Sequence, residues 1–370
     1  MPIDRRSLIL SLGAAIGASL LPRGAGAVGA PPRLFAGCLF DADGGGRLAL
    51  FDPDGRQLVA SDLPARGHDV AVSPDGRLVV AFARRPGTWA AVIERASGRV
   101  LTTILAAPER HFYGHGVFSP DGRLLMATEN DTRGGDGLVG LYDVADGFRR
   151  LGEVPSCGVG PHDMALMPGG ELVAVANGGI RTHPETGRDM LNLDAMRPNL
   201  ALLRRDGGLA DAFELPEAFR LSSLRHIAVA PDGTVGFGCQ YVGDPEAAPE
   251  LIGVLTRSGR LELLPVPEDA NMLFENYIGS VAFDASGTIL AAASPKGGAV
   301  GYWDVPGRRF LGMSRLTDAC GLAAAPASGL FMLSGGASGL RLARAETGDL
   351  ARLGGSDAGR WMWDNHLLTL

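Results

Sequence analysis

Residues 68–82 read His68-Asp-Val-Ala-Val-Ser-Pro-Asp-Gly-Arg-Leu-Val-Val-Ala-Phe82, and this segment returns along the chain. Further copies begin at His115, His162 and Arg225-His226, and weaker ones at Gly279 and Cys320. The intervals between successive starts are 47, 47, 64, 53 and 41 residues. In the strong copies an apolar run, a turn rich in Pro and Gly, and a second apolar run follow one another, as in two short paired strands. A repeat of about 40 to 50 residues with four short strands predicts a β-propeller.

The two ends of the chain supply one further repeat between them. Residues 33–40, 47–51 and 57–61 match the second, third and fourth strands of a unit. The last eight residues, Trp363-Asp-Asn-His366-Leu-Leu-Thr-Leu370, match a lone first strand. We therefore expect residues 28–370 to form one all-β domain, a seven-bladed β-propeller. Three N-terminal strands and one C-terminal strand would close the ring and leave no free sheet edge.

The composition agrees with a globular protein made of strands and tight turns. The chain has 370 residues, of which 46% are hydrophobic, with 54 glycines and 24 prolines. Its formal net charge of −7 argues against nucleic acid as a partner, because proteins that bind phosphate backbones present a basic face.

The first 27 residues have the layout of an export signal. Arg5-Arg6 precedes an apolar run from Leu8 to Leu21, and Ala25-Gly26-Ala27 offers a small-residue cleavage site. This pattern predicts a signal peptide over residues 1–27, export by the twin-arginine route and a periplasmic mature protein. A transmembrane anchor is the alternative, but the run is shorter than the roughly 20 residues that a spanning helix needs. We expect no membrane span in the mature chain.

Five of the seven histidines recur at one place in the repeat, at the start of an innermost strand. These are His68, His115, His162, His226 and His366. In a propeller such positions surround one mouth of the central channel, and imidazole is the commonest ligand for copper, iron and zinc. Asp69 and Asp163 follow two of the histidines and would serve as further ligands or as acceptors that orient a ring. Cys320 takes the corresponding place in the sixth repeat.

A structural role for the same histidines is the alternative. In WD-type propellers a Gly-His pair is structural, because its ring bonds an aspartate of the same blade. Gly67-His68 and Gly114-His115 fit that pattern, with Asp143 or Asp304 as the matching aspartate. Three or more ring nitrogens that converge on one point would favour a metal, whereas pairing within each blade would favour a scaffold.

Polar side chains near the ends of several strands form a second set of candidates, for binding. They are Glu129, Asn130, Asn177, Arg181, His183, Arg225, Gln240, Ser280, Asp364 and Asn365. An insertion over residues 177–199 accounts for the longest interval and would act as a lid, an anion clamp or a solvated loop. Solvated polar loops are the alternative for much of this set.

Other familiar sites are missing from the sequence. The chain has no Gly-x-Ser-x-Gly, no phosphate-binding Gly-x-x-x-x-Gly-Lys and no His-Glu-x-x-His. The four cysteines are widely spaced and include no haem-attachment Cys-x-x-Cys-His. The sequence allows one disulfide but does not show which cysteines would form it.

Several segments together resemble the periplasmic propeller family catalogued as domain of unknown function 1513. They are Asn177-Gly-Gly-Ile-x-Thr-His183-Pro, Leu191-Asn192-Leu, Arg225-His226, Tyr277-x-Gly-Ser280, Ser294-Pro-x-Gly-Gly298 and Trp363-Asp-Asn-His366. The resemblance covers essentially the whole mature chain. It implies gene neighbours of the imelysin-like and di-haem oxidoreductase-like kinds, in clusters that look like iron-uptake systems. It therefore implies a role near periplasmic metal, and it implies no reaction.

Three functions stay open on the sequence alone. The first is a periplasmic metal-handling propeller that binds iron or copper or docks an iron-uptake partner. The second is a metal-dependent hydrolase, lactonase or oxidoreductase built on the same ring. The third is a protein-interaction scaffold with structural histidines.

Overall fold

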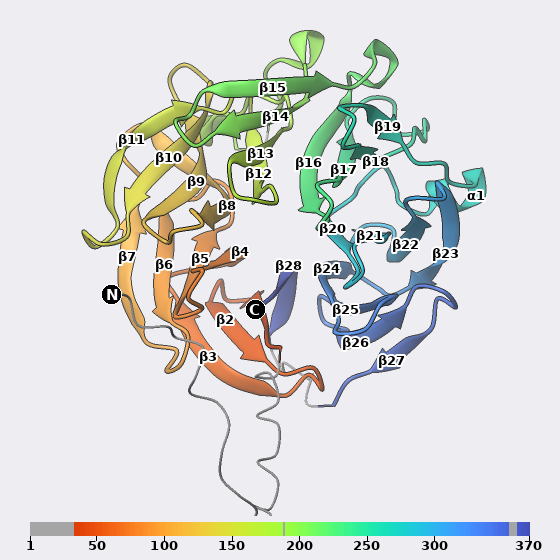
Figure 1. Ribbon diagram of the computed structural model, residues 1–370, viewed down its shortest axis with the longest axis horizontal. Coiled ribbons are helices and arrows are strands. Elements are labelled where there is room, and N and C mark those ends of the chain that lie inside the picture. Colours follow the sequence, from red (N-terminus) through yellow and green to blue (C-terminus); the bar gives the residue numbers. More distant parts are fainter. Residues whose placement is uncertain (1–32, 188, 355–360) are drawn as a thin grey trace, which may run out of the picture. The chain divides into compact units, whose positions relative to one another are not determined.

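The computed structural model describes residues 33–187, 189–354 and 361–370, so the predicted signal peptide lies outside the described residues. Within these ranges the chain forms seven four-stranded antiparallel sheets, arranged as blades around a central axis (Figure 1). The all-β, seven-bladed prediction is confirmed. We number the blades along the chain from the first complete sheet, so that blade 7 is the one built from both ends.

In blades 1 to 6 the strands run in chain order from the axis outward, and in blade 7 the last strand of the chain is innermost. Blade 1 holds β4 (Gly67–Val72), β5 (Leu78–Ala83), β6 (Trp89–Glu94) and β7 (Val100–Leu105). Blade 2 holds β8 (Arg110–Phe118), β9 (Leu124–Asp131), β10 (Gly137–Asp143) and β11 (Arg149–Pro155). Blade 3 holds β12 (Pro161–Leu166), β13 (Leu172–Asn177), β14 (Asn199–Arg204) and β15 (Leu209–Glu214). Blade 4 holds β16 (Ser222–Val229), β17 (Val235–Tyr241), β18 (Ile252–Leu255) and β19 (Leu261–Leu263).

The remaining blades repeat this order. Blade 5 holds β20 (Ser280–Phe283), β21 (Ile289–Ser294), β22 (Ala299–Asp304) and β23 (Arg309–Arg315). Blade 6 holds β24 (Ala319–Ala324), β25 (Leu330–Gly335), β26 (Gly339–Arg344) and β27 (Leu350–Arg352). Blade 7 holds β28 (Met362–Thr369), β1 (Phe35–Phe40), β2 (Gly46–Phe51) and β3 (Gln57–Leu63). Short helical turns lie in connections: α1 (Glu268–Met272), η1 (Pro184–Thr186), η2 (Leu193–Ala195) and η3 (Glu217–Phe219).

Blade 7 closes the ring as the sequence predicts. The C-terminal strand β28 pairs antiparallel with β1, with Ala36 opposite Leu368 and Phe40 opposite Met362. Strands β2 and β3 continue the sheet outward. Because the two ends of the chain share one sheet, the propeller cannot open without breaking this pairing.

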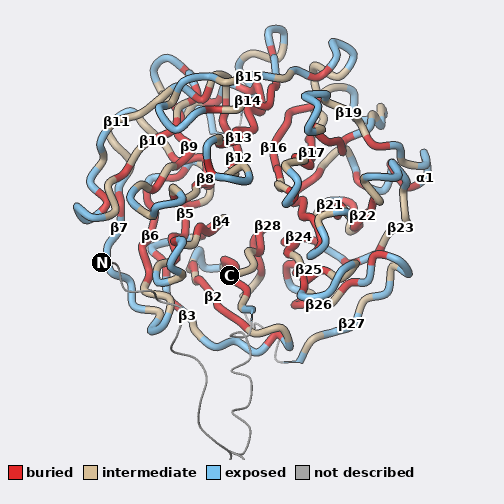
Figure 2. Tube along the Cα trace, viewed as in Figure 1, coloured by how far each residue is buried: buried red, intermediate tan, exposed pale blue. Residues whose placement is uncertain are grey.

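The core lies between the blades. Middle strands such as β5 and β6 are almost wholly buried, whereas outer strands such as β7 are exposed along most of their length (Figure 2). Aromatic side chains such as Phe82, Tyr142 and Trp303 are fully buried in this core, among many Ala, Val and Leu side chains. The four cysteines are free thiols. In the part of the chain that the structure describes, no helix is long and apolar enough to cross a bilayer.

Candidate functional site

The five repeated histidines lie where the innermost strands are irregular. In blade 1 the β4–β5 pairing shifts register between Gly67 and Val70, around His68. Similar shifts flank the histidines of β8, β12, β16 and β28. Strand β20 of blade 5, which carries Ser280 instead, pairs without a shift. A bulge of this kind turns a side chain away from the regular alternation of a strand, so it can aim each imidazole at the axis.

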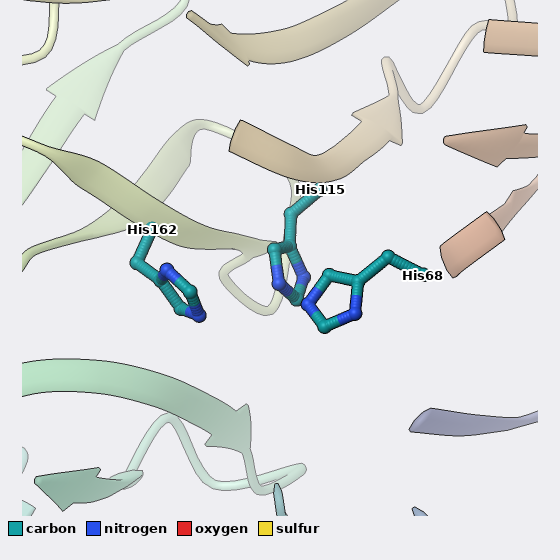
Figure 3. Close-up of side chains that lie close together, drawn as sticks. All are labelled: His68, His115 and His162. Carbon is teal, nitrogen blue, oxygen red and sulfur yellow. The ribbon is translucent and has the colours of Figure 1, made fainter. Parts of the chain in front are cut away.

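The structure brings these five rings together into one cluster, which we call the histidine cluster. Ring centroids are 4.6 Å apart for His68 and His366, 4.7 Å for His162 and His226, and 4.8 Å for His115 and His366. His115 lies at the middle, between 4.8 and 5.9 Å from the other four centroids. Figure 3 shows the rings of His68, His115 and His162 facing one another from three blades. All five side chains are buried.

Three groups of residues in this region could hold a metal ion, and His115 belongs to each. One group is His68, His115 and His162, and a second is His115, His226 and His366. The third joins His115 to Asp69 and Asp163. Within each group the candidate ligand atoms lie within 4.8 Å of one another. Three nitrogens bound tetrahedrally to one ion would lie about 3.3 Å apart. Small side-chain rotations would therefore bring the ligand atoms of a group to the spacing that coordination requires.

Carboxylates fix two of the rings through Nδ1. His68 donates from Nδ1 to Asp364 at 2.8 Å. His115 contacts Asp69 and Asp163 through Nδ1 at 2.9 and 3.2 Å. Metal-binding histidines usually donate their second ring N–H to a carboxylate in this way, because the bond sets the tautomer and the ring orientation. Asp69 and Asp163 therefore occupy the orienting role that the sequence offered as one alternative.

Three ring nitrogens of the cluster are buried and have no hydrogen-bond partner among the described residues. They are Nε2 of His115, Nδ1 of His226 and Nε2 of His366. These atoms belong to the three histidines of one candidate metal group. A buried polar atom without a partner costs roughly 1–3 kcal/mol, so three in contact call for an explanation. A metal ion bound by all three would supply one.

Most of the cluster is electrically neutral at neutral pH. Burial lowers the pKa of His68 to about 4, against the opposing influence of Asp364. Burial and neighbouring cationic groups hold the pKa of His162, His226 and His366 well below the usual value. For His115 the burial also disfavours charge, but Asp163 and Asp69 outweigh it and raise the pKa to about 10. Four imidazoles thus keep the lone pairs that metal binding requires, whereas His115 would have to release its proton to become a ligand.

An ionic network covers the cluster on the face where the innermost strands begin, here called the strand-start face. Asp364 accepts hydrogen bonds from Arg66 Nε at 2.5 Å and Arg84 Nη1 at 2.6 Å. Arg225 donates to Ser223 and approaches His162 Nδ1 at 3.5 Å. Burial alone would raise the pKa of Asp364, but the bond from His68 and the two arginines keep it well below its usual range.

The opposite side of the cluster faces a cavity of about 960 Å³ along the axis, here called the central channel. Asp69, Asp163, His226 and His366 lie at its inner end. The turn at Pro74 and Asp75, where an innermost strand ends, forms part of its outer rim and is exposed. The histidine cluster therefore forms the floor of a channel that opens on the strand-end face.

Several other predicted binding residues are engaged in loop and strand-end structure. Asn177 is fully buried and bonds Ser156 and Asn199. Asn130 donates to the Thr182 carbonyl, Gln240 to the Ile278 carbonyl, and His183 accepts from Glu185 N within the insertion. The Arg181 backbone donates to Asn192, while its side chain is exposed. Ser280 lines the channel, and Asn365 is buried beside Asp364.

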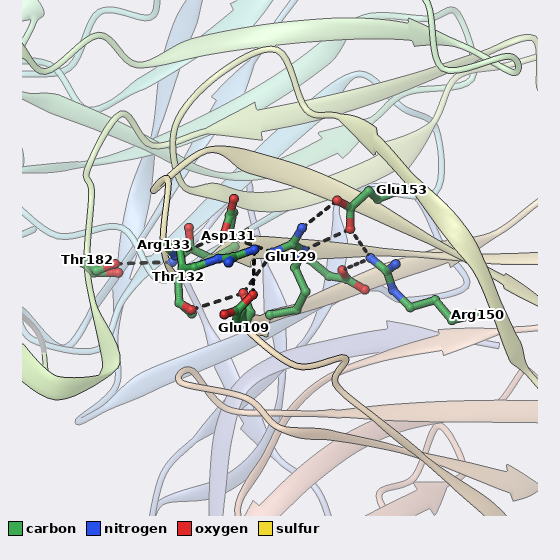
Figure 4. A network of polar contacts seen from close by, with 10 residues as sticks. Glu109, Glu129, Asp131, Thr132, Arg133, Arg150, Glu153 and Thr182 are labelled. Atoms are coloured by element: carbon green, nitrogen blue, oxygen red, sulfur yellow. Dashed lines mark hydrogen bonds and ion pairs between the residues drawn. The ribbon is translucent and has the colours of Figure 1, made fainter.

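Glu129 lies in a separate network within blade 2. It accepts hydrogen bonds from Tyr142 and from Arg150 Nη2, the latter at 2.7 Å. Arg150 also bonds Glu153 (Figure 4). Glu153 in turn pairs with Arg110. This network ties strands β8 to β11 together. Within the described residues, none of its contacts involves the histidine cluster. The hydrogen bonds from Tyr142 and Arg150 compensate the burial of the Glu129 charge, which explains its place inside the otherwise largely apolar strand β9.

Cys320 stands outside the three candidate metal groups of the described residues. Its thiol donates to the Asp318 carbonyl at 3.0 Å, and burial raises its pKa. The WD-type interpretation expected Asp143 or Asp304 to pair with a histidine ring of the same blade, and neither does so among the described residues. Asp143 accepts from Ala145 N, and Asp304 bonds Gly307 N and Arg309. The carboxylates that hold His68 and His115 come from neighbouring blades instead.

Comparison with known proteins supports the fold and leaves the chemistry open. The family described as "Protein of unknown function (DUF1513)" matches residues 61–370. Among solved structures, the chain is similar to Kuenenia stuttgartiensis hydrazine synthase, with a TM-score of 0.62 and 12% identity over 82% of this chain and 90% of that one. At that identity the likeness shows the fold alone. No curated protein matches the chain.

Proposed function

The chain belongs to this family of unknown function, and we propose that it is a periplasmic protein that binds a transition metal in the histidine cluster. The observation that carries the proposal is the set of three buried ring nitrogens without partners, on His115, His226 and His366. Two of the five rings are oriented by carboxylates, which is the usual support for a metal-binding imidazole. His68 and His162 would complete or vary the coordination.

The ligand chemistry limits the choice of metal. Neutral imidazole suits iron, copper, zinc and nickel, whereas magnesium and calcium prefer oxygen ligands. We propose iron first, because the family resemblance implies neighbours that look like iron-uptake proteins. Copper is the second candidate, since divalent copper binds a given nitrogen site more tightly than iron does. The periplasmic location and the docking of an imelysin-like or di-haem oxidoreductase-like partner are parts of the same proposal.

Metal content is the test of this proposal. The mature protein would be purified without chelator and analysed by plasma mass spectrometry, and the metal-free form titrated with Fe²⁺ under nitrogen and with Cu²⁺ and Zn²⁺. We expect one ion per chain in the native protein and a loss of at least about tenfold in affinity for His226→Ala and His366→Ala.

The chain offers matched controls for these two variants. His111 and His183 are the histidines outside the cluster, so His111→Ala and His183→Ala should keep the metal. Absence of bound metal under every condition would refute the proposal. So would equal metal content in the cluster variants and the controls, provided that circular dichroism shows all four variants folded.

A second candidate function is a metal-dependent hydrolase or oxidoreductase. The observation that favours it is the central channel, which reaches His226 and His366 and gives a small molecule a route to the site. Turnover that requires metal and disappears in His366→Ala would establish this activity. A purely structural role is not favoured, because the rings do not pair within their own blades.

A further inference from the structure

The walls of the central channel are mostly apolar, with charged side chains such as Asp75 and Arg95 at the outer rim. Residues from several innermost strands line it, among them Val72, Val117, Leu166, Val229 and Leu368, and these five are only partly buried. Soluble proteins seldom leave so much apolar surface unpaired in one concave place unless it contacts a ligand or partner. The volume of about 960 Å³ is at the upper end of the range of small-molecule sites.

Polar groups gather at the inner end of the channel, and few of them are free to meet a ligand. The Asp163 carboxylate accepts hydrogen bonds from the backbone N–H groups of Met164 and Ile227 and also contacts His115. Asp69 is likewise engaged with His115. His226 and His366 line the channel floor, and each also carries a buried ring nitrogen without a hydrogen-bond partner, so a metal held by these two rings would lie next to the channel.

This combination specifies a class of ligand. We propose that the central channel binds a molecule with an apolar body and one metal-binding nitrogen or oxygen atom at its end. The body would lie against the channel wall, and the end atom would complete the coordination of a metal held by His226 and His366. The inference rests on the proposed metal site and adds the chemical class of the ligand that binds next to the metal.

A pair of probes that differ only in the apolar body tests the inference. Imidazole and 4-phenylimidazole present the same nitrogen to a metal, and one carries a phenyl ring in addition. Their dissociation constants would be measured by isothermal titration calorimetry on protein loaded with the metal that it retains. We expect 4-phenylimidazole to bind at least about tenfold more tightly, because the phenyl ring buries apolar surface in the channel.

Variants in the channel locate the bound ring. Ala228 and Ala324 line the channel and are half-buried, so Ala228→Trp and Ala324→Trp should fill part of it and remove the preference for the phenyl compound. Ala212→Trp, on the exposed outer strand β15, should leave the preference unchanged. Thermal melting would confirm that each variant is folded.

The outcomes separate this inference from the metal proposal. Metal content is measured first, and protein without metal refutes the proposed function on which the inference rests. If the native protein holds metal but binds both probes equally, the metal site stands and the channel ligand is wrong. A phenyl preference that survives in the folded Ala228→Trp and Ala324→Trp variants would also overturn the inference.

Discussion

Asp364 holds the histidine cluster in place through three side chains at once. It is fully buried, accepts from His68 Nδ1, and pairs with Arg66 and Arg84. The same carboxylate also accepts the backbone N–H of Asn365, which fixes the strand at the residue directly before His366. A single residue therefore sets the orientation of one ring and the position of another.

Replacing this carboxylate should weaken both folding and metal binding. In Asp364→Asn the charge that balances Arg66 and Arg84 is lost, so we expect the free energy of unfolding to fall by about 3–5 kcal/mol. Metal affinity should fall about 10- to 100-fold, because His68 loses its orienting acceptor. Denaturant unfolding and metal titration measure the two effects. Asp62→Asn, at an exposed pair with Arg47, should change either quantity little, and an equal effect there would contradict the account.

The sequence identified the members of the cluster but not the atoms that are available in it. The five histidines recur at one place in the repeat, and repetition around an axis brings equivalent positions together. Which ring nitrogen faces a carboxylate depends on side-chain rotation and on partners from neighbouring blades. For that reason the sequence predicted Asp364 as a binding residue but not its hydrogen bond to His68, which joins blade 7 to blade 1.

At the scale of elements, the bulges of the innermost strands are the features that build the site. Strand β8 contains the residues that make its bulge possible, because Gly114 has a φ of +104°. A Cβ at Gly114 would lie 2.7 Å from His68 Cδ2. The absence of a side chain there lets the rings of neighbouring blades approach each other. The sequence placed His68 at the start of an innermost strand, as β4 has it, but the register shift around this residue was not predicted, because sequence patterns follow regular alternation.

Gly114→Ala should therefore disturb the metal site through His68. We expect metal affinity to fall at least about tenfold, together with a loss of roughly 1–3 kcal/mol from the unfavourable backbone conformation. Gly147→Ala is the control, since Gly147 also has a positive φ, of 61°, but has no atom within 4 Å of an added Cβ. It should lose about 1 kcal/mol of stability and keep its metal. Loss of metal in both variants would show that strain alone, and not contact with His68, is responsible.

Neighbouring blades are also joined at their turns, and Asp284 gives this connection a pH dependence. The burial of Asp284 opposes ionisation, but N–H groups of Ile289 and Gly329 and two serine hydroxyls donate to it and lower its pKa to about 2. A carboxyl with a lowered pKa in the folded state stabilises folding above its unfolded pKa, near 3.8, and this stabilisation is lost as the pH falls toward 2.

Asp284→Asn should thus cost about 2 kcal/mol at pH 7, and the difference from the native protein should shrink below pH 4 and vanish near pH 2. Urea unfolding at pH 7, 4 and 2.5 measures it. A difference that stays constant over this range would mean that the hydrogen-bond geometry, and not the charge, is what matters. Because Ser328 and Gly329 belong to blade 6, the same variant tests the link between blades 5 and 6.

For the whole molecule, the closure of the ring is both the best-predicted feature and the support of the site. Strand β28 completes blade 7 and carries Asp364 and His366, so closure and the histidine cluster depend on the same eight residues. The leftover strands at the two ends could be matched to one repeat unit, which is why this topology was predictable from sequence. The central channel was not predictable, because its volume depends on how seven blades pack together.

Leu367→Ala should weaken the closure itself. The Leu367 side chain packs against Gly37 of blade 7 and Gly321 of blade 6, where added atoms would clash with it. We expect a loss of about 2–4 kcal/mol from the cavity left behind, seen as a lower midpoint of thermal unfolding. Leu58→Ala, on the exposed outer strand β3, should have a much smaller effect. Equal effects at the two positions would show that β28 is no more important than an outer strand.

The central claim, that the converging imidazoles bind a metal, is tested most directly by X-ray absorption spectroscopy of the metal-loaded protein. The account predicts nearest-neighbour nitrogen atoms at about 2.0–2.1 Å with the outer scattering of at least three imidazole rings, reduced by one ring in His226→Ala. A spectrum with sulfur as a neighbour, one with oxygen atoms and no imidazole scattering, or one that His226→Ala leaves unchanged would contradict it.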